Sequence, residues 1–219
     1  MLKVGLTGGI ASGKSIVGEM FIALGAHLVQ ADRIAHQLML PGQSVYNEVV
    51  RHFGGEILNP DLSVNRAKLA EAAFGKASSQ AASHIPSRID ELNRIVHPAV
   101  LRSQEEWMEE MGRQDPRAVA IVEAALILEA GAAKRFDRLI VVTCSDAQRI
   151  ARFAARQKLN LDAARKEVER RMAAQLPDPE KIKAADFVID NSGSLDQTQE
   201  QVRDVWDRLR AEATSRAGA

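Results

Sequence analysis

The stretch GLTGGIASGKSIVG, residues 5–18, decides the fold that we predict for this chain. Residues 8–15 within it match the whole pattern G-x-x-x-x-G-K-[ST] of a phosphate-binding loop, or P-loop. The glycines permit tight turns and a close approach of the backbone, so that backbone N–H groups and the start of the following helix can hold a phosphate. An accidental match in a chain of this length is expected about 1% of the time. The stretch therefore predicts a strand, a loop and a helix that together bind a nucleoside triphosphate.

We expect the loop and its flank to bind the phosphates of a nucleoside triphosphate. The residues concerned are Gly8, Gly9, Ile10, Ala11, Ser12, Gly13, Lys14, Ser15 and Ile16. The ammonium group of Lys14 can bridge the β- and γ-phosphates and neutralise the charge that moves to the leaving group, which gives Lys14 a catalytic role. The hydroxyl group of Ser15 is placed to ligate Mg²⁺. A nucleoside triphosphate and Mg²⁺ are therefore the expected ligands of this loop.

Composition limits the partners of this chain. Its 219 residues carry a formal net charge of zero, so no global positive field would attract nucleic acid or an anionic membrane. No apolar run approaches the roughly 20 residues that cross a bilayer, and we see no signal peptide. The single cysteine, Cys144, cannot form an internal disulfide, which suits a reducing compartment. We expect a cytoplasmic protein that is a monomer or a weak homo-oligomer.

Short segments rich in apolar and β-branched residues predict strands of a parallel sheet that is covered on both faces. They are residues 2–7, 26–31, 118–123, 138–143 and 186–190. Helical segments alternate with these strands, which predicts an α/β protein with a five-stranded parallel sheet in a three-layer α/β/α fold. The first helix, residues 14–24, should end at Gly25, and the last should span residues 197–213.

Two intervals interrupt the alternation, and the first, of nearly ninety residues, is too long for an ordinary crossover. The first predicts a helical insertion, with helices at 43–53, 65–75, 87–96 and 98–112. The second contains two charged helical stretches that are separated by KLNLD, residues 158–162, and it predicts a helical lid. The expected division of this single domain is a core at about 1–31, 115–145 and 185–219, the insertion at about 32–114 and the lid at about 146–184.

A P-loop alone does not distinguish kinases from switches and motors. A GTPase would need a guanine-binding segment of the type N-K-x-D, which is absent, and the D-x-x-G match at residues 190–193 has no guanine motif after it. A motor ATPase would normally end its third strand in an acidic pair, whereas here Glu123 is followed by Ala124. These absences favour a kinase.

A kinase also needs a group that activates the acceptor, and Asp32 follows the second predicted strand. At the carboxyl edge of a parallel sheet its carboxylate would face the γ-phosphate, where it could accept the proton of an attacking hydroxyl or hold Mg²⁺ and water. Alternatively, Asp32 caps a helix that begins at Arg33. The residues leave both roles open.

Arginines cluster in the predicted lid, where their planar guanidinium groups suit the charge of a triphosphate. Arg149, Arg152 and Arg156 are spaced so that they share one helical face. Arg170 and Arg171 follow on the next helix. The alternative is a solvated charged face that pairs with Glu167 and Glu169.

The sequence also resembles the dephospho-coenzyme A kinases over nearly its whole length. The likeness runs through LTGGIASGKS (6–15), VQADRIAHQL (29–38), PGQSVYNEVVRHFG (41–54), NRAKLAEAAF (65–74), LNRIVHP (92–98), ALILEAG (125–131), the arginine-bearing segment 152–175 and ADFVIDNSG (185–193).

This resemblance implies a P-loop kinase of the nucleoside-monophosphate-kinase type. Such an enzyme would use ATP to phosphorylate the ribose 3′-hydroxyl of dephospho-CoA, the last step of coenzyme A biosynthesis. The resemblance implies that Asp32 activates this hydroxyl and that the helical insertion binds the CoA precursor. The substrate-binding residues that it implies are Asp32, Arg66, Phe74, His97, Pro98 and Arg171. Arg152 and Arg156 match lid arginines that bind ATP and act in catalysis, and Asn191 lies in the segment near the adenine.

Three residues depart from the family's usual pattern: Gln30 stands where aspartate is usual, His36 where arginine is common, and Ala125 where proline is usual. For His97, a buried histidine at a helix boundary before Pro98 is an alternative to substrate contact. The alternatives for function are a kinase of another small metabolite or nucleotide, and a non-catalytic ATP-binding module.

Overall fold

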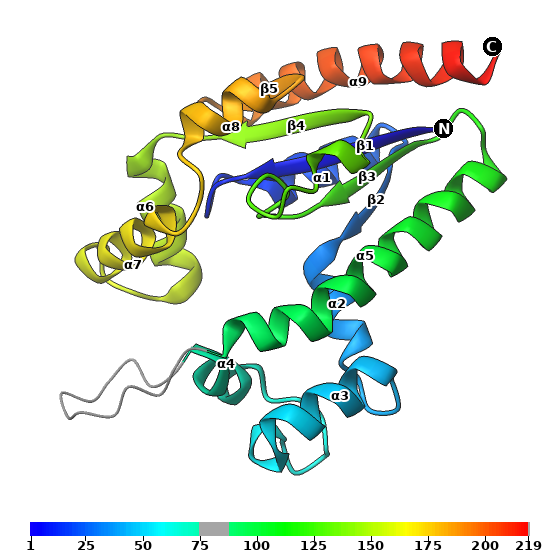
Figure 1. Ribbon diagram of the computed structural model, residues 1–219. Coiled ribbons are helices and arrows are strands. Elements are labelled where there is room, and N and C mark those ends of the chain that lie inside the picture. Colours follow the sequence, from blue (N-terminus) through cyan, green and yellow to red (C-terminus); the bar gives the residue numbers. More distant parts are fainter. Residues whose placement is uncertain (75–87, 219) are drawn as a thin grey trace. The chain divides into compact units, whose positions relative to one another are not determined.

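The computed structural model describes residues 1–74 and 88–218 (Figure 1). Within these residues, five strands form one sheet in the order β2-β3-β1-β4-β5. They are β1 (Leu2–Gly8), β2 (His27–Gln30), β3 (Val119–Glu123), β4 (Arg138–Thr143) and β5 (Phe187–Asp190). Every neighbouring pair is parallel, so the predicted parallel sheet is confirmed, and each strand ends within one residue of its predicted bounds.

The α-helices of the described residues lie between the strands or after the last one, and β3 and β4 are joined without an α-helix. The helices are α1 (Lys14–Ala23), α2 (Ala31–Leu38), α3 (Ser44–Phe53), α4 (Arg66–Phe74), α5 (Ile89–Gln114), α6 (Asp146–Gln157), α7 (Leu161–Ala173), α8 (Asp178–Ala184) and α9 (Leu195–Ala217). As predicted, α1 stops before Gly25, whose φ of 105° is in the left-handed region that favours glycine.

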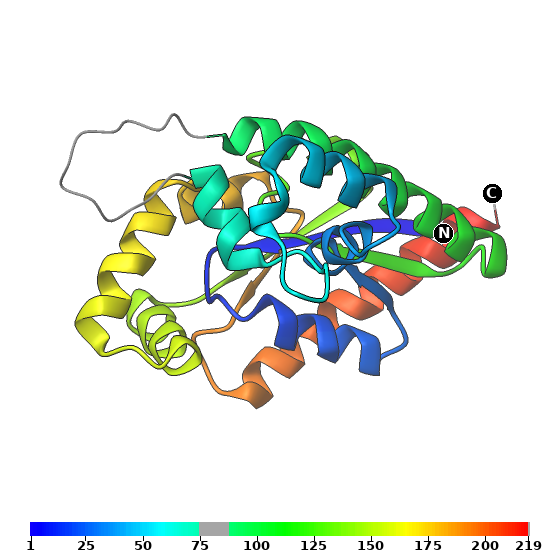
Figure 2. The same cartoon turned by 90° about the horizontal axis from the view of Figure 1, so that it is seen from below.

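Helices α1 and α9 cover one face of the sheet (Figure 2). Phe21 of α1 and Leu209 of α9 are fully buried there, together with Val4 and Leu6 of the central strand β1. On the opposite face, Ile127 packs with Leu139 and Val141 of β4. Because side chains of a strand alternate between faces, the apolar run of β4 supplies both cores at once, with Ile140 and Val142 on one face and Leu139 and Val141 on the other.

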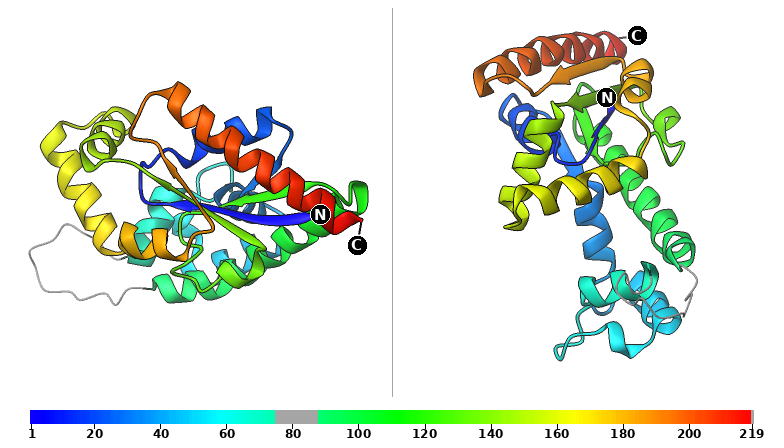
Figure 3. Two further views of the ribbon diagram at one scale, coloured as in Figure 1. Left: turned by 90° about the horizontal axis from the view of Figure 1, so that it is seen from above. Right: turned by 90° about the vertical axis from the view of Figure 1, so that its left-hand side faces the viewer.

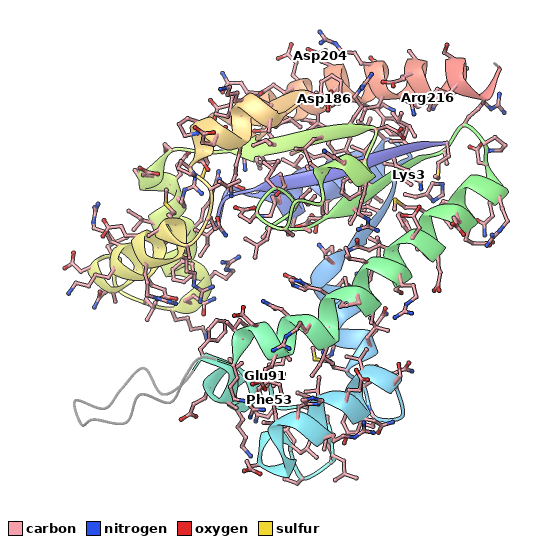
Figure 4. All side chains as sticks on the ribbon, in the orientation of Figure 1. Lys3, Phe53, Glu91, Asp186, Asp204 and Arg216 are labelled. Carbon is pink, nitrogen blue, oxygen red and sulfur yellow. The ribbon has the colours of Figure 1, made fainter. Side chains whose placement is uncertain are left out.

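Ion pairs anchor the C-terminal part of α9 to the sheet (Figure 4). Arg216 Nη1 lies 2.6 Å from Asp137 Oδ1, and Asp137 Oδ2 accepts a hydrogen bond of 2.7 Å from the backbone N–H of Lys3. At the other end, Ser194 and Gln197 form a capping box. This cap starts α9 at Leu195, so the predicted start at residue 197 is two residues late.

The chain divides into two compact units. Met1–Gln30 with Met108–Ala219 form the sheet unit, and Ala31–Trp107 form the helical unit. In the helical unit, the guanidinium group of Arg88 lies 4.4 Å from the centre of the Phe53 ring and hydrogen-bonds Glu91; Figure 4 labels Phe53 and Glu91.

The expected break at Pro98 is wrong. Instead of separate helices at 87–96 and 98–112, α5 runs through Pro98. Proline removes one backbone hydrogen bond from a helix interior, but the buried side chains of Val96 and Val100 hold the helix on either side of it. Residue 87 lies outside the described residues.

The start of α2 differs from the alternative in which its helix begins at Arg33. Helix α2 begins at Ala31, so Asp32 lies in its first turn and does not cap a helix beginning at Arg33. Helix α8 carries Pro179 in its first turn, where proline is tolerated.

None of the helices in the described ranges combines the length and the apolar character that a membrane span requires.

Leu209→Ala should lower the free energy of unfolding by about 2–5 kcal/mol, because it removes a fully buried side chain and leaves a cavity under α9. Leu195→Ala on the same helix is the matched control: Leu195 is 58% exposed, and its loss should change stability by less than about 0.5 kcal/mol. Urea unfolding followed by circular dichroism measures both values. Equal effects of the two substitutions would contradict the packing of α9.

Candidate active site

The P-loop connects the central strand β1 to helix α1. The side chain of its lysine, Lys14, folds back onto the start of the loop. Lys14 Nζ donates hydrogen bonds of 2.9 Å and 3.1 Å to the carbonyl oxygens of Gly8 and Gly9. Gly13 takes a φ of 96°, and Ala11 takes a left-handed φ of 53° where glycine would be less strained. The loop therefore has the sharp turns that its sequence predicted.

Side chains from distant parts of the chain hold the carbonyl group of Ser12. It accepts hydrogen bonds from Asn191 Nδ2 at 2.9 Å and from Arg152 Nη1 at 3.3 Å. Asn191 is buried, and its Oδ1 accepts a hydrogen bond from Thr198. The resemblance implied that Asn191 lies near the adenine; in this structure its amide group contacts the loop backbone.

A small cavity of about 200 Å³ opens at the start of α1. It is lined by Ala11, Gly13, Lys14, Ser15, Ile16, Arg152 and Arg156. The structure thus brings both lid arginines together with the lysine and the serine of the P-loop. The concentration of positive charge beside the N-terminus of α1 suits phosphate groups.

Arg149 shares a helix with Arg152 and Arg156, but it contacts the loop backbone and does not line this cavity. Its side chain is fully buried, where Nη1 donates to the Ile10 carbonyl at 2.9 Å and Nη2 lies 2.5 Å from Asp178 Oδ2. The alternative of a solvated face is therefore wrong for Arg149. A buried charge needs such partners, and this ion pair joins α6, the loop and α8.

Helices α6 and α7 pack against one another and lie at the end of the sheet to which the strands point (Figures 1 and 3). Ile10 of the loop belongs to their apolar cluster. Arg171 of α7 is half exposed, hydrogen-bonds Glu167 at 2.6 Å and lies 5.4 Å from the centre of the Phe153 ring. Hydrogen bonds from Arg170 and Arg171 lower the pKa of Glu167 to about 2, so the alternative pairing with Glu167 is confirmed for these two arginines.

The sequence analysis missed the carboxylate nearest to Ser15. Glu123 ends β3 and is only 8% exposed. Its Oε1 accepts a hydrogen bond of 3.0 Å from Ser15 Oγ, and its Oε2 accepts one of 2.9 Å from Gln30 Nε2. The signal in the sequence is a single acidic residue, Glu123, at the end of a buried strand; an acidic pair is the pattern that indicates a motor ATPase.

The remaining predicted residues belong to the helical unit. Asp32 is exposed in the first turn of α2. Arg66 and Phe74 are exposed at the two ends of α4. His97 and Pro98 are exposed on α5, so the alternative of a buried histidine is wrong. A hollow of about 410 Å³ on this helix is lined by Asp90, Asn93, Arg94, His97 and Pro98. Neither Arg66 nor Phe74 lines it.

The only thiol, Cys144, lies under the loop just after β4. Its Sγ is 3.7 Å from the carbonyl oxygen of Ala11, and burial raises the pKa of the thiol. The described residues contain no group of three or more His, Cys, Asp or Glu side chains that could hold a metal ion.

The parallel sheet, the P-loop and the lysine and arginines beside it define a P-loop kinase. The model of the dephospho-CoA kinase family matches residues 2–197, and the chain belongs to this family. A dephospho-CoA kinase of Syntrophotalea carbinolica is 40% identical over 209 residues, which cover 95% of this chain and 92% of the relative. A dephospho-CoA kinase of Corynebacterium jeikeium is 37% identical over 95% of this chain and 100% of its own.

Solved structures agree with the fold. The crystal structure of TT1252 from Thermus thermophilus has a TM-score of 0.73 at 30% identity, and the match covers 94% of this chain and 96% of that one. The dephospho-CoA kinase from Campylobacter jejuni has a TM-score of 0.59 at 23% identity over the same shares of the two chains, and this likeness concerns the fold.

Gly13→Ala should weaken ATP binding by about 10-fold or more, because a strain of about 1.4 kcal/mol is enough for that factor. A Cβ atom at residue 13 would overlap with Asn191 Nδ2, and the backbone is left-handed there. Gly42→Ala is the matched control: its φ of 91° is also left-handed, but a Cβ atom would meet nothing within 4 Å. Calorimetric titration with ATP measures the two affinities. Equal binding by both variants would contradict the role of the loop.

Proposed function

We propose that this protein transfers the γ-phosphoryl group of ATP to the ribose 3′-hydroxyl group of dephospho-CoA, which yields coenzyme A and ADP. The observation that carries this proposal is the family match over residues 2–197, since a P-loop alone fits many kinases. The cavity beside Lys14 and the two lid arginines supports the donor half of the reaction.

The donor half consists of the P-loop residues 8–16, with Lys14, Arg152 and Arg156 at the phosphates. When bound, Mg²⁺ would neutralise phosphate charge, and Ser15 is the residue of the loop that would ligate it. Arg152 already donates to the loop carbonyl of Ser12 and lines the cavity with Arg156, which supports both arginines as contacts of the transferred group. Asn191 supports the nucleotide site through the backbone of the loop.

The acceptor half rests on Asp32, which lies two residues beyond the end of β2. Its carboxylate would take the proton from the 3′-hydroxyl group, and the oxygen would then form a bond to the γ-phosphorus. The bond between this phosphorus and the β–γ bridging oxygen breaks, and ADP leaves with the electron pair. Lys14 would balance the charge that develops on ADP.

We further propose that the helical segment at about 32–114 binds the acceptor, with Arg66, Phe74, His97 and Pro98 in contact with it. The hollow beside His97 and Pro98 supports this assignment. The segment at about 146–184 would act as a lid and contribute Arg171. The packing of Ile10 among α6 and α7 supports a lid that contacts the loop directly.

The cellular setting is proposed on composition. A net charge of zero and a single cysteine support a cytoplasmic enzyme that binds no nucleic acid and is a monomer or a weak homo-oligomer.

A panel of acceptors tests the reaction. We expect ADP release with dephospho-CoA, and none with AMP, UMP, CMP, gluconate or no acceptor, in a coupled assay. Release without an acceptor would indicate an ATPase, and release only with another acceptor would indicate a different kinase. Binding of ATP without any turnover would indicate an ATP-binding module. Each of these three results contradicts the proposal.

Asp32→Asn should lower kcat by about 100-fold or more, the scale expected for loss of a general base, and leave ATP binding nearly unchanged. Asp196→Asn is the matched control, because Asp196 is also an exposed aspartate in the first turn of a helix. The control reproduces the loss of charge at a helix start, which is worth about 0.3–1 kcal/mol, without touching the proposed base. A kcat near that of the wild type for Asp32→Asn would remove Asp32 from this role.

A further inference from the structure

We infer that Arg149, held in place by Asp178, is a positioning residue that keeps Ala11 of the P-loop in a left-handed conformation suited to phosphate. This inference rests on the proposed function for the nucleotide that the loop binds. It gives the buried ion pair between α6 and α8 a role in nucleotide affinity.

The first half of the P-loop is a tight turn that places Ala11 in an unfavourable conformation. The backbone N–H group of Ser12 donates a hydrogen bond of 3.3 Å to the carbonyl oxygen of Gly9, so residues 10 and 11 are the two central residues of the turn. Ala11 has a φ of 53°. A positive φ at the second central residue is typical of a type II turn, which favours glycine there. For a residue with a Cβ atom, the left-handed region is disfavoured about 5- to 30-fold.

One peptide group decides between this turn and its unstrained counterpart. Turns of types I and II differ by a rotation of the peptide group between the two central residues. Here this group consists of the carbonyl of Ile10 and the N–H of Ala11. In a type I turn, Ala11 would have a φ of about −90°, which is not strained. A side chain that holds the Ile10 carbonyl group therefore also holds Ala11 in the left-handed region.

Arg149 is the side chain that holds this carbonyl group. Its Nη1 donates a hydrogen bond of 2.9 Å to the Ile10 oxygen, and the whole side chain is buried. Gly9 leaves room for it, since a Cβ atom there would overlap with Arg149 Nη1. The C=O and N–H groups of a trans peptide point in opposite directions, so the N–H group of Ala11 points away from Arg149. This orientation offers the N–H group to phosphate in the cavity that Ala11 lines.

Asp178 keeps the guanidinium group of Arg149 in place. Asp178 Oδ2 lies 2.5 Å from Arg149 Nη2, and the same nitrogen donates a hydrogen bond of 3.4 Å to the carbonyl oxygen of Cys144. A second carboxylate, that of Asp146, is exposed and lies farther away, at 3.7 Å from Arg149 Nε. A buried guanidinium group needs a close carboxylate, and Asp178 supplies it.

Loss of Arg149 should therefore act through residue 11. With the peptide group free to rotate, Ala11 would be left-handed in only a fraction of the molecules, and the apparent affinity for a nucleotide falls by that fraction. Glycine adopts the left-handed and right-handed regions about equally. A loop with Ala11→Gly should thus depend much less on Arg149. A residue that only stabilised the fold would not show this dependence.

The experiment measures ADP binding by calorimetry, without an acceptor. Arg149→Met keeps a long side chain and removes the donors, and it is made with Ala11 and with Ala11→Gly. Arg113→Met is one control, because it also removes an arginine from an ion pair, but this pair with Glu110 is exposed. Lys158→Gly is the control for glycine, because Lys158 at the end of α6 has nearly the same left-handed φ, 54°.

We expect Arg149→Met to lower ADP affinity by about 5- to 30-fold when residue 11 is alanine. With Ala11→Gly the same substitution should lower it by less than about 3-fold. The loss should stay in full with Lys158→Gly, and Arg113→Met should match the wild type. An unchanged affinity for Arg149→Met, or an equal loss with Ala11 and with Ala11→Gly, would overturn the inference. So would an equal loss for Arg113→Met, or a loss that Lys158→Gly reduces as much as Ala11→Gly does.

Asp178→Asn replaces Arg149→Met if the latter does not fold, because it keeps the shape of the side chain and removes its charge. We again expect a loss of ADP affinity that is smaller with Ala11→Gly, and an equal loss in both cases would overturn the inference. A wild-type protein that binds no ADP would overturn the proposed function as well. A failure of transfer to dephospho-CoA is visible in the acceptor panel alone.

Discussion

A P-loop that offers its backbone N–H groups to phosphate needs other donors for its carbonyl groups. In this protein, side chains supply them. The donors are Lys14 for Gly8 and Gly9, Arg149 for Ile10, and Asn191 and Arg152 for Ser12. The shape of the loop therefore depends on side chains of α6 and on the residue that follows β5. These elements are distant in sequence, and the parallel sheet brings them to the same edge because all strands point the same way.

The arginines of α6 divide into two kinds, although helical spacing puts them on one face. Arg149 is buried against Asp178 and stabilises the loop from behind, whereas Arg152 and Arg156 line the cavity in front of it. A guanidinium group with several donors can serve both purposes, and Arg152 contacts the loop backbone as well as the cavity. The arginine that stabilises the loop, Arg149, lies nearer the start of α6 than the two arginines that line the cavity.

The sheet and the loop could be predicted from the sequence, because both depend on patterns of neighbouring residues. Buried parallel strands appear as continuous apolar runs, and the P-loop has a fixed spacing of glycine, lysine and serine. Other features depend on long-range contacts. Burial of Val96 and Val100 carries α5 through Pro98, and the inward turn of Arg149 depends on Asp178, which is distant from it in sequence. Glu123 meets Gln30 only when β2 and β3 align, and this register is not encoded in either strand alone.

The position of Cys144 has a practical consequence. Its thiol is the only one in the chain, it is buried, and it contacts the carbonyl group of Ala11 in the loop. Burial limits the access of a thiol reagent to it, and the same burial raises the pKa of the thiol, which disfavours the reactive thiolate. The rate at which Cys144 is chemically labelled therefore reports how often the structure beneath the P-loop opens locally, and the native protein needs no engineered probe for this measurement.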